Sequence, residues 1–442
     1  MARARSTCSR AGVSDVHNKT GRVSAGWIAV GSVTAVLMAT SGARFLFGVV
    51  LKPVSEEFGW SRTDLSAAVL INMLVLCAFQ PLVGELVDRF GSRRMLLAGV
   101  LALVVTLIPI SYASELWHWY LFYGVLSAFG IAATSPVNTT SLVSGWFTRR
   151  RGTAMAIATS GSAFGQLIIV PAAAFTLART DWHTVYRALA LLLLVAVAPL
   201  VLLFVREAPG AREPKRGHQT KDGLPVPPAT LRSSLAGSPF WLLAFGFFVC
   251  GFTMAFANTH FLAYADDMGM APVDASHIVA ATALFSIVGS VVLGLAADRY
   301  PRQGVLALTY ALRGLAFLLL LALPAGGLTY VYAVVLGISW TATTPLTAAI
   351  AADLYGRQRL GVIFGTMFTF MNLGFGAGAF LDGVAYDVTG SYHGALIVNV
   401  VFGLAAALAV TRVKPAPAAV IHAELAAPGA PAIAMPGSGR AD

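Results

Sequence analysis

Residues 84–95 read GELVDRFGSRRM, and residues 294–303 read GLAADRYPRQ. Both are short charged stretches in a chain of 442 residues that is 57% hydrophobic and only 11% charged. The Asp-Arg pair of the second stretch follows that of the first by 210 positions. A charged stretch that returns half a chain later indicates an internal repeat, and the apolar sequence around each copy shows what is repeated.

The apolar sequence has the length and composition of membrane spans. Its mean hydropathy is +0.75, and its charged fraction is less than half of the roughly 25% found in soluble domains. A helix needs about 20 apolar residues to cross the hydrocarbon core. The strands of a membrane barrel alternate between apolar and polar residues, whereas these runs are apolar at odd and even positions alike. The sequence therefore predicts an all-α membrane protein with twelve spans, near 25–51, 62–86, 94–113, 117–142, 151–178, 185–205, 239–265, 276–297, 304–323, 328–352, 359–383 and 393–411.

The basic residues are distributed unevenly between the two sides of the membrane. With a cytoplasmic N-terminus, 24 of the 30 Lys and Arg residues fall on the cytoplasmic side, while the 20 acidic residues divide equally. This is the positive-inside pattern, which counts Lys and Arg and largely ignores Asp and Glu. The net charge of +10 is thus explained by orientation without nucleic acid. We expect a multi-pass protein of the cell inner membrane with both termini cytoplasmic.

Composition divides the chain into five segments. Residues 1–24 form a basic cytoplasmic tail, and two halves of six spans each cover 25–205 and 239–412. The segment 206–238 between them is rich in Pro, Gly and basic residues, as flexible linkers are. The Ala- and Pro-rich tail 413–442 is predicted to be disordered.

Several other classes of protein are disfavoured. Cys8, Cys77 and Cys250 give neither a disulfide framework nor a metal-ligand spacing. The chain has no G-x-x-x-x-G-K-[ST] loop and none of the H-E-x-x-H or G-x-S-x-G motifs of hydrolases. We therefore expect no enzymatic activity, no metal and no cofactor.

The two halves repeat one another at more places than the charged stretches. TSPVNTTSLV at 134–143 and TTPLTAAIAA at 343–352 align their prolines at an offset of 209. The GxxxG pairs at 161/165 and 374/378 align at an offset of 213, and we expect them to allow close helix approach at a moving interface. Two parallel six-helix repeats build one large transporter fold.

The stretch at 84–95 resembles the signature loop of the major facilitator superfamily. The resemblance implies that Asp88 helps to latch the two halves in an outward-facing state, with Asp298 and Arg299 as a weaker second copy. A plain basic loop that only sets topology is the alternative. The gating residues expected on this basis are Gly84, Asp88, Arg89, Gly91, Arg93, Arg94, Asp298 and Arg299.

Three further patches resemble the monocarboxylate-porter branch of that superfamily and its bacterial relatives. They are WFTRRRGTAMAIATSG at 146–161, FGWSRTDLS at 58–66 and YDVTGSYHGA at 386–395. Members of the branch commonly carry an Asp and an Arg four residues apart in span eight, where this chain has Val292 and Ala296. The resemblance thus extends to the scaffold, while the usual carboxylate-binding pair is missing.

Arg44 is the strongest candidate for substrate binding. A charge inside a span costs at least about 2.5 kcal/mol and usually marks function. Arg44 shares a helical stripe of small and polar residues with Thr34, Ser41 and Gly48, and its guanidinium can bind a carboxylate through two hydrogen bonds. Alternatively, Arg44 extends toward the outer interface, since Pro53 follows nine positions later.

We single out three other ionisable residues within the spans. His260 titrates near neutral pH and is a candidate for proton coupling and substrate contact, although a lone histidine often only packs. Asp382, near the outer end of span eleven, is a second proton candidate, with an exposed mouth as the alternative. Arg313 in span nine, an outer helix of this fold, is expected in a structural ion pair.

Polar side chains on spans that border the cavity of this fold complete the predicted site, although amides also bind helices to one another. They are Asn138, Gln166, Asn258, Trp340 and Asn372.

Together these features predict a monomeric secondary transporter that moves a small organic anion by alternating access, coupled to protons. Export of drugs or secondary metabolites in exchange for protons is one alternative. A membrane receptor without transport activity is another.

Overall fold

The structure, a computed structural model, describes a chain of helices. In the part described, every regular element is helical, and twelve helices are long and apolar enough to cross a membrane, as predicted. The described residues are 8–135, 138–139, 142–143, 146, 151–207, 234–322, 329–355 and 360–413.

The first six spans are built from helices that include three π-helical segments. A π-helical segment adds one residue to a turn and often lies at a functional site. The elements are α1 (Cys8–Phe58), α2 (Arg62–Phe90), α3 (Ser92–Ile110), α4 (Leu116–His118), η1 (Trp119–Leu126), α5 (Ser127–Ala133), α7 (Arg151–Phe164), η2 (Gly165–Ile169), α8 (Val170–Leu177), α9 (Trp182–Leu192), η3 (Leu193–Val197) and α10 (Ala198–Phe204).

The last six spans contain one further π-helical segment, in span seven. The elements are α12 (Ser238–Ala255), η4 (Phe256–His260), α13 (Phe261–Asp267), α14 (Pro272–Arg299), α15 (Arg302–Ala322), α16 (Thr329–Trp340), α17 (Thr343–Tyr355), α18 (Leu360–Thr389) and α19 (His393–Thr411).

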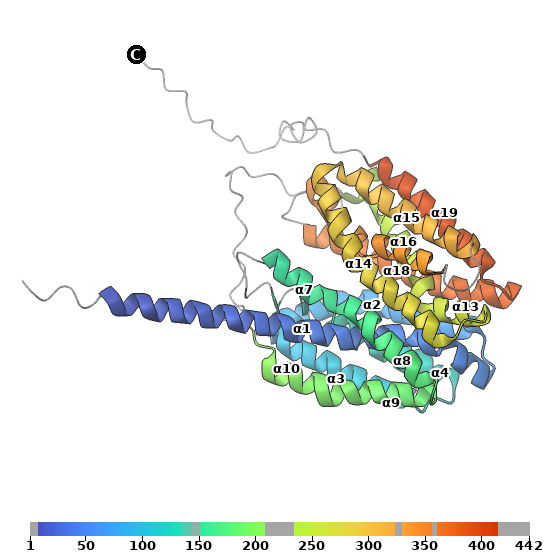
Figure 1. Cartoon of the computed structure of the whole chain (residues 1–442), viewed down its shortest axis with the longest axis horizontal. Coiled ribbons are helices and arrows are strands. Elements are labelled where there is room, and N and C mark those ends of the chain that lie inside the picture. Colours follow the sequence, from blue (N-terminus) through green and yellow to red (C-terminus); the bar gives the residue numbers. More distant parts are fainter. Residues whose placement is uncertain are drawn as a thin grey trace, which may run out of the picture.

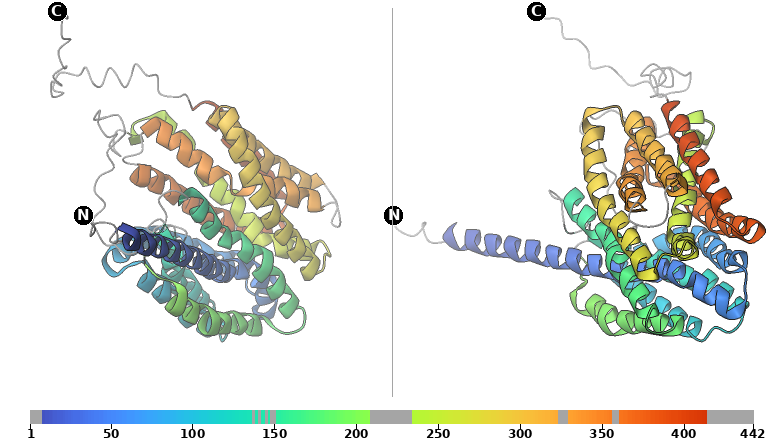
Figure 2. Two further views of the ribbon diagram at one scale, coloured as in Figure 1. Left: turned by 60° about the vertical axis from the view of Figure 1, so that its left-hand side comes forward. Right: turned by 45° about the vertical axis from the view of Figure 1, so that its right-hand side comes forward.

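These elements form two bundles that lie side by side. Figure 1 shows α1 to α10 together in blue and green, and α14 to α19 together in yellow to red, and both views of Figure 2 agree. One apolar core comes mostly from residues 29–205, and two others come from residues 240–413. Between the bundles, α2 packs along α18, and α14 packs on η2 and α8.

The two ends of the bundle are named after Arg62 and Asp88. The Arg62 end carries the connections at 59–61, 178–181, 268–271 and 390–392, and the Asp88 end carries the connections at 91 and 300–301. At the Asp88 end, α1 extends well beyond the other helices (Figures 1 and 2).

The first span is longer than predicted. α1 runs without interruption through Pro53 to Phe58, whereas the sequence suggested an end near residue 51. Proline lacks the amide hydrogen and usually bends or ends a helix. Here the helix continues because Val50, Leu51 and Val54 are buried in the first core, so tertiary packing offsets the local penalty.

Spans four and ten are interrupted, whereas the sequence suggested continuous helices. α5 ends at Ala133, and α16 ends at Trp340, two residues before α17 begins. In both spans a proline follows shortly, Pro136 in the first and Pro345 in the second. A proline clashes with the carbonyl four residues earlier and frees it, which explains the breaks and their repetition in the two halves.

The GxxxG pairs allow close helix approach as predicted, although the helices they join lie in the same half. A Cβ on Gly161 would lie 2.4 Å from the Thr34 oxygen of α1, and one on Gly374 would lie 2.0 Å from the Phe248 oxygen of α12. A Cβ on Gly165 would lie 2.6 Å from a backbone oxygen of α1, and one on Gly378 would lie 2.6 Å from a backbone oxygen of α12. These pairs therefore fix each half rather than the interface between halves.

Candidate transport site

Two predicted amides meet at the centre of the interface. Gln166 lies in η2 of the first half, Asn258 lies in η4 of the second, and Gln166 Nε2 donates to Asn258 Oδ1 over 2.7 Å. Asn258 Nδ2 in turn donates to the Met254 carbonyl over 2.7 Å. Both amides lie in π-helical segments, which widen the helix locally and turn these side chains toward one another.

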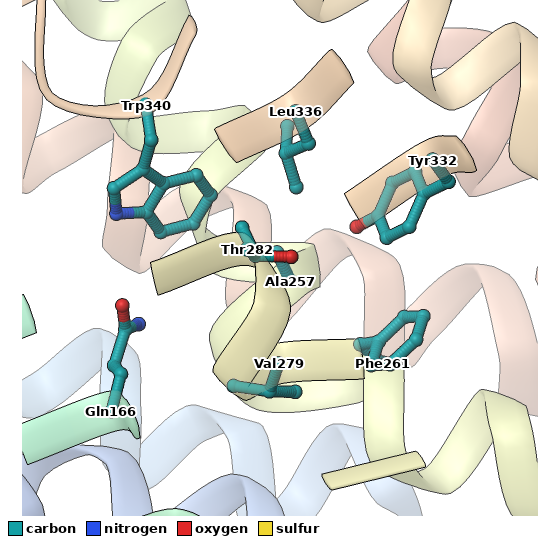
Figure 3. A pocket seen from close by; sticks show the side chains of 8 residues that line it. All are labelled: Gln166, Ala257, Phe261, Val279, Thr282, Tyr332, Leu336 and Trp340. Carbon is teal, nitrogen blue, oxygen red and sulfur yellow. The ribbon is translucent and has the colours of Figure 1, made fainter. Parts of the chain in front are cut away.

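A small pocket adjoins this pair of amides. It encloses about 250 Å³ of empty space, part of which is open to solvent. In Figure 3 the Gln166 amide points toward the indole of Trp340, while Phe261 and Tyr332 lie at the other end. The remaining lining residues are Ala257, Val279, Thr282 and Leu336. Gln166 and Trp340 thus line the same pocket, an apolar site with few polar groups.

Arg44 lies between α2 and α18, toward the interface of the halves. Its Nη2 is 3.7 Å from the Met73 sulfur, and its guanidinium carbon is 4.9 Å from the centre of the Phe375 ring. Its Nε is buried and has no hydrogen-bond partner. Among the described side chains, none with a carboxylate lies within 4.0 Å of Arg44. The side chain thus turns inward and does not extend to the outer interface.

Another buried cation, Arg313, has oxygen partners at both of its terminal nitrogens, although its Nε has no hydrogen-bond partner. It is 0% exposed, and its Nη2 donates to the carbonyls of Ser339 and Trp340 over 2.7 and 3.0 Å. These are the carbonyls at the end of α16, which the break in span ten frees. The contacts differ from the expected ion pair, because the guanidinium binds backbone oxygens and not a carboxylate. Arg313 thereby stabilises the position of Trp340 in the pocket.

Asn138 has an equivalent role at the break in span four. It is 2% exposed, and its Nδ2 donates to the Ala133 carbonyl over 2.7 Å, with the Ser92 carbonyl at 3.5 Å. These contacts favour helix packing over substrate contact. Asn372 of α18 is also buried. Near it, Cys77 Sγ of α2 donates to the Thr369 carbonyl of α18 over 3.8 Å, across the interface of the halves.

His260 and Asp382 are both buried near the Arg62 end. His260 is 0% exposed and Asp382 is 1% exposed. His260 contacts the hydroxyl of Tyr392, the Ala379 carbonyl and, at 3.4 Å, the Ser66 hydroxyl. One carboxyl oxygen of Asp382 is buried without a hydrogen-bond partner. The side chain of Asp382 is therefore not part of an exposed mouth.

Charged residues that the sequence reasoning passed over join the two halves at the Arg62 end. Lys52 Nζ lies 2.8 Å from Asp266 and 3.0 Å from Asp267. Arg62 holds Asp267 with both nitrogens of its fork, at 2.7 and 2.9 Å, and its guanidinium lies 3.7 Å from the centre of the Tyr386 ring. Such two-point pairs are the strong form of a carboxylate contact.

Asp387 adds a second kind of bond across the interface. Its carboxylate accepts from the backbone amides of Arg62 and Thr63, over 3.2 and 2.7 Å. These are the first amides of α2, so an acid at the end of α18 satisfies the N-terminus of α2 and its partial positive charge. We refer to Lys52, Arg62, Asp266, Asp267 and Asp387 as the latch.

The sequence contained a signal for the latch. Arg62 belongs to FGWSRTDLS, while Asp387 belongs to YDVTGSYHGA, two of the patches that resemble the monocarboxylate-porter branch. The structure brings these two patches, more than 320 positions apart, into direct contact. Each patch contains one side of the contact, but neither patch indicates the other as its partner.

The Asp88 end shows the predicted turn. Gly91 has φ 90° and joins α2 to α3, a conformation that a side chain disfavours. The Arg93 amide donates to Glu207 over 3.2 Å, and the Arg93 guanidinium donates to the Leu202 carbonyl. Arg89, Arg94 and Arg299 are exposed. The side chains of Asp88 and Asp298, and position 84, lie outside the described residues.

The chain is similar to known transporters over most of its length. The family model described as Major Facilitator Superfamily matches residues 33–273 and 243–438. An MFS-type transporter of Bacillus subtilis (strain 168), YcxA, is 25% identical over 83% of this chain and 90% of its own. Monocarboxylate transporter 13 of Rattus norvegicus is 27% identical, with 86% and 87% covered.

A solved structure shows the same fold. The bacterial homolog of the human lysosomal transporter Spinster, in an inward-facing and unoccupied conformation, superposes with a TM-score of 0.65 at 15% identity. It covers 90% of this chain and 96% of that one. With twelve candidate spans and a family match over most of the residues, this multi-pass membrane protein is a transporter and not an enzyme. The chain belongs to the major facilitator superfamily.

Proposed function

We propose that this transporter carries a small organic anion together with protons by alternating access. The positive-inside distribution of Lys and Arg supports an inner-membrane orientation with both termini in the cytoplasm. The Arg62 end then faces outward. The residues 206–238 connect the halves 25–205 and 239–412 on the cytoplasmic side.

The observation that carries the proposal is the unpaired charge of Arg44. Lys52 and Arg62 hold carboxylates, and Arg313 holds four backbone and side-chain oxygen atoms and a sulfur. Among the residues that the structure describes, Arg44 instead meets a thioether and an aromatic ring. An uncompensated guanidinium within the membrane is costly. A carboxylate on the substrate would supply the missing partner through two charge-assisted hydrogen bonds.

The relatives support the anionic substrate class. Monocarboxylate transporters 13 and 11 are 27% and 26% identical to this chain over more than 80% of it. Because Val292 and Ala296 replace the carboxylate-binding pair of that branch, Arg44 takes over its role here. The amides of Gln166, Asn258 and Asn372, with Trp340, contact the remainder of the substrate.

Proton coupling is assigned to His260, with Asp382 as the second carrier. Both side chains are buried close to the latch, and both can exchange a proton when the Arg62 end opens. His260 has the side chain whose ordinary pKa lies nearest to physiological pH.

Uptake by the purified protein in liposomes tests the proposal. We expect accumulation of at least one acid from a carboxylate panel, stimulated by an inward proton gradient. Arg44→Gln should lower that uptake about 30-fold or more, because a buried charged partner is lost. Arg179→Gln removes an exposed guanidinium outside the spans and should leave uptake unchanged.

Two results would contradict this assignment. Normal uptake by Arg44→Gln would remove Arg44 from the site. Silence of the whole panel, in tight vesicles that contain folded protein, would instead favour export or a substrate without a carboxylate.

A further inference from the structure

A chain of hydrogen bonds connects the buried His260 to the latch. Arg62 Nη1 donates to the Tyr392 hydroxyl oxygen over 2.8 Å. The same hydroxyl lies 3.0 Å from His260 Nδ1, and His260 Nε2 lies 2.7 Å from the Ala379 carbonyl oxygen. Tyr392 is 3% exposed and Arg62 is 5% exposed, so little water competes for these bonds.

The chain of bonds assigns a direction to each donor. A carbonyl oxygen only accepts, so His260 Nε2 carries the hydrogen toward Ala379. In the neutral imidazole, Nδ1 then has a lone pair and accepts the hydroxyl hydrogen of Tyr392. The Tyr392 oxygen in turn accepts from Arg62. The order Arg62 to Tyr392 to His260 to Ala379 is consistent only with an uncharged His260.

A proton on His260 would disrupt that order. Nδ1 would become a donor and could no longer accept from Tyr392. The hydroxyl oxygen would then face two cationic donors, His260 and Arg62, and its own hydrogen would need another acceptor. The two positive charges would also repel one another across a single tyrosine in surroundings with little water.

The groups that face His260 come from every neighbouring element. The carboxyl groups of Asp382 and Asp387 on α18 would favour a positive charge on His260, whereas the Arg62 guanidinium opposes it. Asp387 is already bonded to the amides of α2, so its carboxylate is not free to pair with the ring. The titratable, charged or hydroxyl groups around His260 and its partner Tyr392 are Arg62 and Ser66 of α2, Tyr264 and Asp267 of α13, and Asp382, Tyr386 and Asp387 of α18.

We propose that His260, Tyr392 and Arg62 form a proton-sensitive gate at the Arg62 end. Protonation of His260 displaces Tyr392 from Arg62, Arg62 loses its alignment with Asp267, and the latch opens. Deprotonation restores the bonds and closes it. The gate deepens the proposed function and rests on it for its role in transport. A protonated carrier without substrate stays open at the Arg62 end. A proton therefore does not cross the membrane without the second solute.

Distance measurements between spin labels test the gate without any substrate. The labels are placed at Ser114 and Val388, both exposed at the Arg62 end in opposite halves, after replacement of Cys8, Cys77 and Cys250. In the otherwise unchanged protein, we expect the population with a long distance to rise about fivefold or more between pH 8 and pH 5.5.

Three variants separate the gate from general effects of pH. Tyr392→Phe removes only the connecting hydroxyl, and His260→Gln removes the titrating group, so both should abolish the pH response. Tyr264→Phe is the matched control, because its hydroxyl donates to the Leu320 carbonyl over 3.3 Å and not to His260. It should respond as the unchanged protein does.

The outcomes are decisive in both directions. A distance distribution independent of pH, or one that responds equally in Tyr392→Phe and Tyr264→Phe, would overturn the gate. Because no substrate is present, that result would leave the assignment of Arg44 intact. Conversely, silence in the uptake panel would not affect a pH response that depends on Tyr392.

Discussion

The two ends of the bundle use charge in different ways. At the Arg62 end, Lys52 and Arg62 of the first half bind Asp266 and Asp267 of the second. At the Asp88 end, the ion pair described between Arg302 and Asp353 stays within the second half. The Arg93 amide likewise binds Glu207 within the first half. Among the residues that the structure describes, the charge pairs that join the two halves, which alternating access would have to break, lie at the Arg62 end.

This difference indicates what each end requires. A latch between moving halves has to be strong in one state and absent in the other, so its energy sets the balance between states. Ion pairs within a half move as one body and leave that balance unchanged. Substitutions at the two ends should therefore separate changes of conformation from changes of stability.

Among the variants at the two ends, Asp267→Asn should change the population that is open at the Arg62 end the most. Asp267 binds both Lys52 and Arg62, and its loss leaves two cations at the interface with weaker partners. We expect the population open at the Arg62 end to rise about tenfold, which corresponds to ~1.4 kcal/mol. The spin-label pair at Ser114 and Val388 measures it.

The matched control is Glu56→Gln. Glu56 also lies near Lys52, at 3.8 Å, but it belongs to the same helix and is largely exposed. Exposed pairs contribute little. An equal shift in both variants would show that charge at this end, and not the bond between halves, sets the population.

Asp88→Asn tests the opposite end and should have a smaller effect. If Asp88 latches the halves when the Arg62 end is open, its removal should lower that open population by a few-fold, opposite in sign to Asp267→Asn. The same label pair measures the change. Asp353→Asn breaks a pair within one half and should leave the distances unaltered, and an unchanged Asp88→Asn would leave that loop a topology signal only.

Sequence reasoning located the spans well because membrane burial depends on local composition. All twelve spans were predicted, and the aromatic and amide residues Trp340, Gln166 and Asn258 were expected at the site. The latch was missed because Arg62 and Asp387 stood in two separate patches, each of which only supported the family resemblance. Their bond joins positions 325 apart in sequence, and no local pattern specifies such a partner.

The breaks in spans four and ten were missed for another reason. The mean hydropathy of residues 329–355 is high enough for one continuous span, so it does not reveal the break at Thr341 and Ala342. The prolines that follow each break were visible, but their effect depends on whether another group satisfies the freed carbonyls. Arg313 and Asn138 do so here, and neither contact can be read from spacing along the chain.

Asp181→Ala should lower the stability of the protein without changing the population that is open at the Arg62 end. It thus separates stability from conformation at the same end of the bundle. Asp181 is the N-cap of α9, and its Oδ1 accepts from the Thr184 amide over 2.6 Å. Loss of such a cap costs about 1 kcal/mol, so we expect a lower melting temperature in detergent with an unchanged label distance.

The pH dependence of that loss follows from the same bond. The Thr184 amide holds the pKa of the Asp181 carboxyl below its ordinary value. The stabilisation is therefore complete above the ordinary pKa of about 3.9 and is lost as the pH falls through the lower pKa of the folded state. The melting difference between Asp181→Ala and the unchanged protein should be constant from neutral pH to about pH 5 and shrink below it. Asp181→Asn keeps a capping oxygen but has no carboxyl group to titrate. The melting difference between Asp181→Ala and Asp181→Asn should therefore not depend on pH. A difference between these two variants that shrank at low pH would show that the pH dependence does not come from the Asp181 carboxyl.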